Sequence, residues 1–227
     1  MKQYMGEGSK FKLTGSKILA AILILAGLGV LGYYGGEKLL VAYHQYQLRK
    51  AFEDSFYDIP SSTDTYRRVV ITEWSPMRLI IPKIDVDLMV LSGDVFDRNL
   101  LDKGPVHYGN YYENLYSPLP STEPGNVAIA AHRGAKWMFF FRLDELEEGD
   151  QMIIEMAGYR FIYEVEWQKI IEPDDWSVIA PTDYPALTLT TCEPKTGVST
   201  HRLIVRGKLV EVLNIADSDA VNTVTYG

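Results

Sequence analysis

The sequence of 227 residues predicts an all-β domain, either a barrel or a sandwich, preceded by a single N-terminal transmembrane helix. Residues 18–36 carry no charged side chain, which is typical of a membrane-spanning helix. From about Met77 onward, short runs rich in β-branched and aromatic residues follow one another closely. Most of these runs have no helical segment between them, and this pattern indicates an all-β architecture.

The apolar segment 18–36 reads ILAAILILAGLGVLGYYGG. At a rise of about 1.5 Å per residue it spans roughly 28 Å, close to the thickness of the hydrocarbon core. The preceding basic residues Lys10, Lys12 and Lys17 predict a cytoplasmic N-terminus and an extracellular position for the rest of the chain. A cleaved signal peptide is the alternative, but the apolar core is long for one and no A-x-A-like cleavage site follows it.

The residue composition of the chain after the apolar segment changes twice. Residues 37–56 are compatible with a helix, and the polar run DIPSSTD at residues 58–64 is typical of a turn. We therefore expect five regions: a cytoplasmic N-terminus (1–17), a transmembrane anchor (18–36), an extracellular stalk (37–75), a β-domain (76–212) and a polar C-terminal tail (213–227).

Seven segments of the β-domain have the composition of strands. Ala157-Gly158 separates two of them and favours a β-hairpin. Within the domain, only residues 137–146 have a helical pattern, and that segment is short. The predicted strands are residues 77–82, 86–91, 126–131, 151–156, 159–171, 186–192 and 202–212.

Composition excludes several classes of function. The net charge of −8 and the pI of about 5.0 argue against nucleic acid as a partner, because a duplex-binding surface needs clustered basic residues. The single cysteine, Cys192, excludes an internal disulfide and a cysteine-rich zinc site. Cys192 is then either a buried inert thiol or a thiol kept for chemistry.

Three residues with catalytic potential lie where predicted strands meet loops. His132 follows one strand, Cys192 ends another and Arg202 begins the last. Side chains at such junctions reach a surface cleft from a rigid sheet. A thiolate, an imidazole and a guanidinium together suit acyl transfer, in which a nucleophile, a proton carrier and an oxyanion partner are needed.

The motifs around these residues resemble those of the sortase family. Residues 188–192 read TLTTC, similar to the T-L-x-T-C strand that ends in the family's nucleophile. Residues 202–205 read RLIV, similar to the strand that opens with the family's arginine. Residues 124–133 read PGNVAIAAHR and resemble the strand before the family's histidine, with Ala131 where glycine is usual.

The resemblance covers about residues 77–212, with further matches at IPKI (81–84), GPVHY (104–108) and FRLDEL (141–146). It is greatest to the class D and class E sortases, although one sequence does not separate these two classes. It implies a closed β-barrel of about seven to eight strands with short helices. It also implies a single-pass protein of a Gram-positive cell membrane, with an extracellular catalytic domain.

The resemblance further implies a membrane-anchored cysteine transpeptidase. Cys192 would cleave an LPxTG-like or LAxTG-like sorting motif between Thr and Gly, with His132 moving protons and Arg202 stabilising the oxyanion. A thioester acyl-enzyme would then pass a surface protein to an amine of a cell-wall precursor. This chemistry requires no metal and no organic cofactor.

Other interpretations of single residues remain. His201 is adjacent to Arg202, but neighbouring strand residues point to opposite faces, which favours His132 as the catalytic histidine. Arg206 lies four residues beyond Arg202 and is a second candidate for the oxyanion role. His107 either lines the site or makes a structural hydrogen bond.

Other functions also remain open. The main alternative is a non-catalytic, membrane-anchored β-domain that binds cell-wall components. A peptidase would use the same acyl-enzyme and release it to water, so the sequence does not separate it from a transpeptidase. An L,D-transpeptidase-like enzyme is disfavoured, because Thr190 and Thr191 stand where an S-H-G-C-type run would place its histidine.

Overall fold

The structure is a computed structural model that describes residues 15–55, 68–112, 115–134 and 136–215. The chain forms two units, residues 1–42 and residues 43–227. Lys10, Lys12, the polar run 58–64 and the last part of the tail lie outside the described residues.

Helix α1 runs from Gly15 to Ser55 and contains the apolar segment without a break. Within the described residues it is the one helix long and apolar enough to cross a membrane, with a mean hydropathy of 2.1 over its most apolar 18-residue window. Forty-one residues at about 1.5 Å each give a helix of roughly 60 Å, about twice the hydrocarbon thickness. The boundaries of the predicted anchor and stalk stay predictions.

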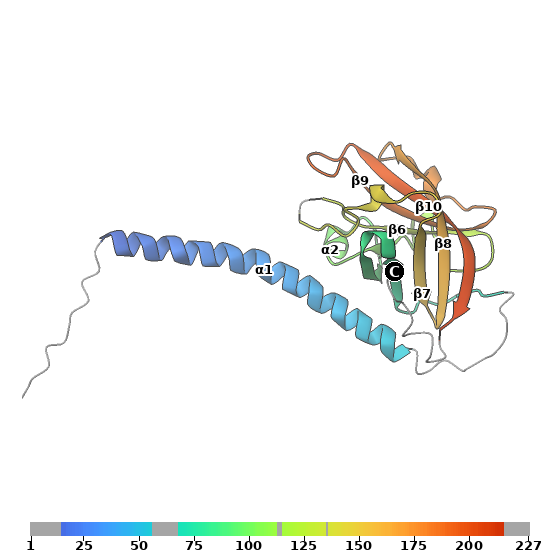
Figure 1. Cartoon of the computed structure of the whole chain (residues 1–227), viewed down its shortest axis with the longest axis horizontal. Coiled ribbons are helices and arrows are strands. Elements are labelled where there is room, and N and C mark those ends of the chain that lie inside the picture. Colours follow the sequence, from blue (N-terminus) through green and yellow to red (C-terminus); the bar gives the residue numbers. More distant parts are fainter. Residues whose placement is uncertain (1–14, 56–67, 113–114, 135, 216–227) are drawn as a thin grey trace, which may run out of the picture. The chain divides into compact units, whose positions relative to one another are not determined.

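Eight strands close into a barrel in the spatial order β1-β2-β3-β6-β9-β10-β8-β7 (Figure 1). This confirms the predicted all-β closed barrel. A separate pair is formed by β4 (Asn110–Tyr112) and β5 (Leu115–Tyr116). The barrel strands are β1 (Met77–Ile81), β2 (Val86–Ser92), β3 (Val106–His107), β6 (Gly125–Ala130), β7 (Gln151–Met156), β8 (Tyr159–Ile171), β9 (Pro185–Glu193) and β10 (His201–Asn214).

The hairpin predicted at Ala157-Gly158 joins β7 to β8. Both turn residues have positive φ, 50° and 78°, as the two central residues of a type I′ turn require. The long strands β8 and β10 pair along their whole length and lie side by side in Figure 1. At Gly207 of β10 an added Cβ would lie 2.8 Å from the Glu164 carbonyl oxygen, so the close approach of these strands requires glycine there.

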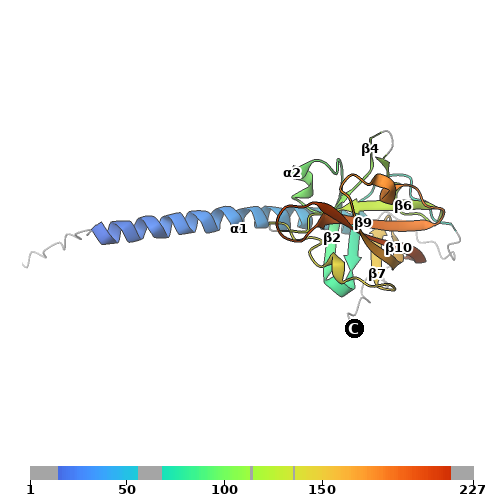
Figure 2. The same ribbon diagram turned by 90° about the horizontal axis from the view of Figure 1, so that it is seen from above.

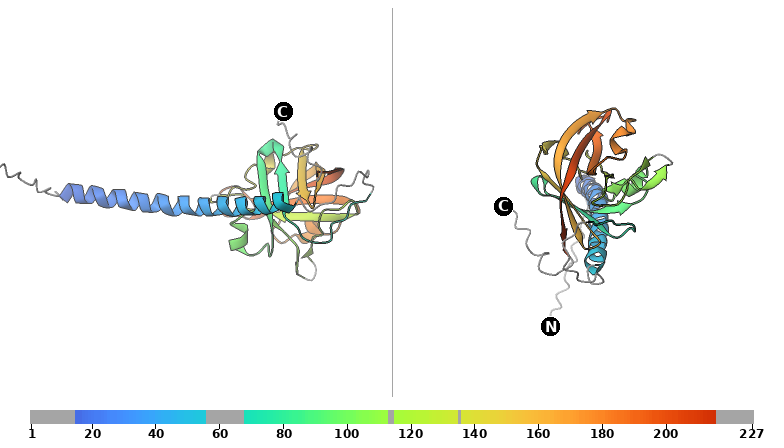
Figure 3. Two further views of the ribbon diagram at one scale, coloured as in Figure 1. Left: turned by 90° about the horizontal axis from the view of Figure 1, so that it is seen from below. Right: turned by 90° about the vertical axis from the view of Figure 1, so that its right-hand side faces the viewer.

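Short helical turns connect the strands, as expected for this barrel. They are η2 (Pro82–Ile84), α2 (Arg98–Leu101), η3 (Leu143–Glu145) and η4 (Trp176–Ile179). The β1–β2 hairpin, which contains η2, is drawn in teal in Figure 3. Inside the barrel, aliphatic and aromatic side chains from facing strands form one apolar core, which includes Leu79, Ile129, Phe161, Leu189 and Val205, all 0% exposed.

The α-helix expected at residues 137–146 is absent, and this prediction was wrong. The segment consists of turns and the single 3₁₀ turn η3. Trp137, Phe140, Leu143 and Leu146 are its buried apolar residues, at intervals of three. A period of three matches the 3₁₀ helix and not the α-helix, so packing against the core favours tight turns.

Two strand pairs of the barrel are parallel, β2 with β3 and β6 with β9. Strands β6 and β9 lie side by side in Figure 2 and pair from Gly125–Pro185 to Ala130–Thr190. Parallel strands bring their carboxyl ends to the same edge of a sheet, so the segments that follow β6 and end β9 meet at one rim of the barrel.

Candidate active site

Cys192 and Arg202 lie on the neighbouring strands β9 and β10, and His132 lies in the segment that directly follows β6. His132 and Cys192 each lie two residues beyond the last registered pair of β6 and β9, Ala130 and Thr190. On the other side of β9, Cys192 is the register partner of Arg202 on β10. Neighbouring strands are about 4.8 Å apart, so the three side chains start from adjacent points at one rim.

Two hydrogen bonds extend the register of β6 and β9 up to these residues. The Ala131 amide donates to the Thr190 carbonyl at 3.2 Å, and the Thr191 hydroxyl donates to the Ala131 carbonyl at 2.7 Å. Thr191 is therefore a structural residue that ties the segment before His132 to the segment before Cys192. The buried Thr191 hydroxyl gives the Ala131 carbonyl, beyond the end of β6, a hydrogen-bond donor from a side chain.

All three candidates line one cleft of about 330 Å³. The cleft is lined mainly by apolar side chains, with polar and charged ones among them that include Arg98, Asp175 and Thr190 besides the three candidates. This is the usual composition of a site that binds part of a peptide. Its walls come from the β2–α2 connection, the residue after β3 and the segment around η4, and include Val95, Phe96, Tyr108, Trp176, Val178 and Ile179.

His132 has a carboxylate partner that sequence reasoning missed. Its Nε2 lies 3.0 Å from Oδ1 of Asp102, at the carboxyl end of α2. The side chains are 25% and 40% exposed, so both reach the solvent at the rim. A carboxylate in this position fixes the rotation of the ring and directs Nδ1 away from itself. The sequence around Asp102, just before the GPVHY motif, did not indicate this contact, because 30 residues separate Asp102 from His132.

Arg202 has its side chain at the cleft, where Nη1 donates to the Ser199 hydroxyl and to the His201 carbonyl, both at 3.0 Å. Both of these acceptors are neutral, so neither of them cancels the charge of the guanidinium. A guanidinium held by neutral acceptors keeps its positive charge available for an anion.

Arg133, directly after the histidine, is buried to 2% exposure and joins the two strand ends. It pairs with Asp144 at 2.9 Å and with Glu193, and Nη1 donates to the Cys192 carbonyl at 3.3 Å. Burial would raise the pKa of Asp144, but hydrogen bonds from Lys195 and Arg133 outweigh it and lower that pKa. The sequence motif contained this arginine, yet its contacts with Cys192 and Glu193 span 59 and 60 residues of the chain.

The alternative residues are engaged elsewhere. His201 contacts Thr200 at 2.9 Å and Glu172 at 3.4 Å, and it is not among the cleft-lining residues. Arg206 donates to the Thr188 hydroxyl at 3.1 Å and to the Val178 carbonyl, and it stacks on Trp167 at 4.8 Å. Arg206 therefore supports the wall of the cleft.

His107 makes structural hydrogen bonds, the second of the two roles considered for it. Its Nδ1 accepts from the Gly109 amide at 3.2 Å, so the ring proton is on Nε2, which donates to the Pro118 carbonyl at 3.0 Å. Burial lowers the pKa of His107 to about 4, although the bond to Pro118 opposes this effect.

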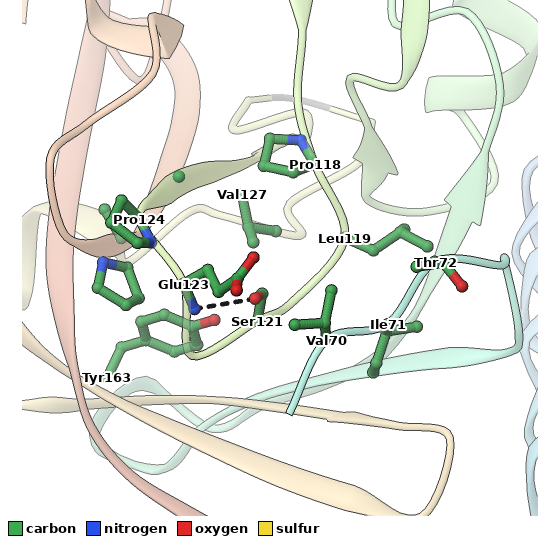
Figure 4. A pocket seen from close by; sticks show the side chains of 13 residues that line it. Val70, Ile71, Thr72, Pro118, Leu119, Ser121, Glu123, Pro124, Val127 and Tyr163 are labelled. Atoms are coloured by element: carbon green, nitrogen blue, oxygen red, sulfur yellow. Dashed lines mark hydrogen bonds between the residues drawn. The ribbon is translucent and has the colours of Figure 1, made fainter. Parts of the chain in front are cut away.

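A second hollow of about 260 Å³ lies at the other end of β6 and β9, around Gly125 and Pro185. Figure 4 shows the Tyr163 hydroxyl directed toward Ser121 and Glu123 in this hollow. Burial raises the pKa of Tyr163. None of the three candidate catalytic residues lines this hollow, so it is separate from the rim that carries them.

A closed barrel with a cysteine, a histidine and an arginine at one cleft has the components of a cysteine acyl-transfer enzyme. The sequence model of the Sortase domain family matches residues 79–210, more than half of the chain. The chain belongs to the sortase family, whose members are cysteine transpeptidases that act in cell-wall anchoring of surface proteins.

Individual relatives agree with the class D and class E resemblance. Sortase D of Bacillus subtilis is 31% identical over 209 residues, which are 86% of this chain and 98% of the relative. Sortase SrtE1 of Streptomyces coelicolor is 33% identical over 143 residues, 59% of this chain but 40% of the relative's length. The crystal structure of Sortase E1 from Streptomyces coelicolor, with a tripeptide in its active site, has a TM-score of 0.57 at 29% identity, covering 64% of this chain and 95% of that one.

Proposed function

We propose that this sortase cleaves an LPxTG-like or LAxTG-like sorting motif between Thr and Gly and transfers the protein to an amine of a cell-wall precursor. The catalytic residues in this proposal are Cys192, His132 and Arg202. The observation that carries it is the register of β6, β9 and β10, which places these three residues next to one another at the cleft.

In the first half of the reaction, the Cys192 thiolate attacks the threonine carbonyl carbon. The carbonyl oxygen becomes an oxyanion, and the Arg202 guanidinium donates hydrogen bonds to it. As the C–N bond breaks, protonated His132 gives its proton to the departing glycine amine. The products are a thioester on Cys192 and the released peptide that begins with glycine.

In the second half, an amine of the cell-wall precursor attacks the thioester carbon. His132 accepts the proton from this amine, Arg202 again stabilises the oxyanion, and the Cys192 thiolate leaves. A new amide links the surface protein to the precursor. Water in place of the amine would give hydrolysis from the same intermediate, so the acceptor determines the outcome.

We also propose that residues 18–36 of α1 anchor the enzyme in the membrane with the N-terminus in the cytoplasm. The uncharged segment of α1 supports the anchoring. The preceding lysines support the orientation. In this arrangement the β-domain, residues 76–212, is outside the cell, where sorting motifs and wall precursors meet.

The test uses the full chain in detergent micelles and quenched peptides with LPxTG-like and LAxTG-like motifs, with and without added diamine or glycine-type nucleophiles. We expect cleavage between Thr and Gly by the wild type, amide product when amine is present, and a thioester adduct on Cys192 detected by mass. Cys192→Ala, His132→Ala and Arg202→Ala should each lose activity. Because Cys192 is the single cysteine of the chain, labelling by a thiol reagent reports on this residue alone.

The alternative, a non-catalytic domain that binds cell-wall components, predicts a different result. No peptide would be cut, and Cys192 would show the reactivity of an ordinary thiol. Binding of wall fragments would then be unchanged in Cys192→Ala.

A further inference from the structure

The open edge of strand β2 is covered by a section of α1, within the unit of residues 43–227. On one side β2 pairs with β1 along five residues. On its other side it pairs with β3 only at Leu91 and Ser92. The backbone groups of the preceding residues on that edge would otherwise lack partners from the barrel.

Two helix side chains replace the missing strand. Gln45 accepts from the Met89 amide at 2.7 Å and donates to the Met89 carbonyl at 3.1 Å. Arg49 donates to the Asp87 carbonyl at 3.2 Å and pairs with the Asp87 carboxylate at 2.9 Å. Four helix residues rise about 6 Å and two strand residues about 6.6 Å, so a helix spacing of four matches alternate residues of a strand.

Gln45 makes a third hydrogen bond, to a residue outside β2. Its Nε2 also donates to the Lys103 carbonyl at 3.0 Å. At the next residue, Gly104, an added Cβ would lie 2.5 Å from this Nε2 and 2.9 Å from Leu91. The backbone of Lys103 and Gly104 is thus seated directly on the amide of Gln45, and the absence of a side chain at Gly104 allows the contact.

The residue just before Lys103 is Asp102, the partner of His132. On one side the Asp102 amide is held by the Arg98 carbonyl of α2 at 2.9 Å. On the other side the bond from Gln45 to Lys103 and the bond from the Leu91 amide to the Pro105 carbonyl, 2.8 Å, hold the chain that follows. Gln45 is therefore one of the contacts that set the position of the carboxylate under His132.

We propose that Gln45 is a positioning residue for the reaction, which acts through Lys103 and Asp102 on the ring of His132. This inference rests on the proposed function of His132. The helix section of residues 43–55 is then part of the catalytic unit. It positions a residue of the site as well as linking the β-domain to the preceding helix. Apolar contacts support the same docking, since Leu48 packs with the cluster around Leu91 and Phe52 is 5% exposed.

The kinetic test compares Gln45→Ala with two matched variants of the full chain in micelles. Gln47→Ala removes an exposed glutamine from the same helix. Arg49→Ala removes a comparable contact to β2 but does not touch Lys103. We expect Gln45→Ala to lower kcat about tenfold with KM nearly unchanged, because a small displacement of a catalytic group is costly. Gln47→Ala and Arg49→Ala should keep kcat within about twofold.

A double-mutant cycle tests the route through Asp102. If Gln45 acts through Asp102, the double variant Gln45→Ala/Asp102→Ala should have the kcat of Asp102→Ala alone. Multiplied losses in the double variant would overturn the proposal. Equal losses of kcat in Gln45→Ala and Arg49→Ala at equal melting temperature would also overturn it, because helix docking alone would then account for the effect.

A spectroscopic arm does not depend on turnover. The ¹⁵N resonances of the His132 ring, assigned with His132→Gln, should move in Gln45→Ala and stay in place in Gln47→Ala. Unmoved His132 resonances in Gln45→Ala would contradict the inference even if the enzyme were active. If the wild type cuts no peptide, the proposed function fails, and this arm still decides whether Gln45 positions the ring.

Discussion

The Arg133 guanidinium donates a hydrogen bond to the backbone carbonyl of Cys192, with Nη1 and the oxygen 3.3 Å apart across 59 residues of sequence. The same side chain pairs with Glu193, the residue after the cysteine, and with Asp144. One buried guanidinium therefore joins the segment after His132 to the segment that carries Cys192. Its contribution can be measured as stability and as activity.

The first prediction concerns this buried arginine. Arg133→Ala should lower the free energy of unfolding by about 3 kcal/mol, because it removes a buried guanidinium that donates to Asp144, Glu193 and the Cys192 carbonyl. Arg142→Ala is the matched control. Arg142 pairs with Asp85 and Glu145 at the surface, where such pairs contribute at most about 1 kcal/mol. Denaturant unfolding of the full chain measures both, and equal losses would contradict the prediction.

The second prediction concerns the carboxylate of Asp102. Asp102→Ala should lower kcat/KM by about tenfold to a hundredfold, since the ring of His132 loses the group that orients it. Asp102→Asn should retain more activity, because the amide oxygen still accepts a hydrogen bond from Nε2. Glu172→Gln alters the carboxylate beside the other strand-end histidine, His201, and should leave kcat/KM unchanged. An Asp102→Ala enzyme as active as Glu172→Gln would rule out this role.

The third prediction concerns pH and stability. The pKa of His107 is about 4 in the folded chain and 6.5 for the free side chain, because burial disfavours the charged ring. The unfolded chain therefore binds the extra proton first as pH falls. The stabilisation is complete above about pH 6.5 and is lost as pH falls toward 4, by about 3 kcal/mol in total.

His107→Gln should flatten this part of the stability curve. Gln47→Ala, at an exposed residue without a titratable group, provides the control and should leave the curve between pH 6.5 and pH 4 as it is in the wild type. Unfolding by denaturant at a series of pH values is the measurement. A wild-type curve with no decline in this range would show that His107 takes up a proton as easily when folded.

The fourth prediction concerns the wall of the cleft. Arg206 holds the Val178 carbonyl and the Thr188 hydroxyl, so Arg206→Ala should loosen the segment around η4. We expect KM for the sorting peptide to rise about fivefold or more with kcat nearly unchanged, as for a loss of substrate binding alone. Lys208→Ala, on the same strand, is the control. A large loss of kcat with unchanged KM would instead favour the oxyanion role for Arg206.

Much of the barrel was predictable because strand signals are local. The expected strands at residues 151–156 and 159–171 match β7 and β8, and the turn at Ala157-Gly158 has the expected positive φ angles. Strand β3, with two residues, carries too short a pattern to be recognised. The prediction of a helix at 137–146 was wrong because an aromatic, apolar run does not show whether its buried residues repeat every 3 or every 3.6 residues.

The sequence by itself determined an apolar helix long enough to cross a membrane, the all-β domain and the family. These follow from residues close together in the chain, namely one uncharged run, strand periodicities and the motifs around His132, Cys192 and Arg202. The tertiary structure alone decided which residues contact these three or the segments that carry them, because the bonds of Asp102 to His132, Arg133 to Cys192 and Gln45 to Lys103 span 30 to 60 residues. Such contacts depend on strand register and on the closure of the barrel, which no local pattern specifies.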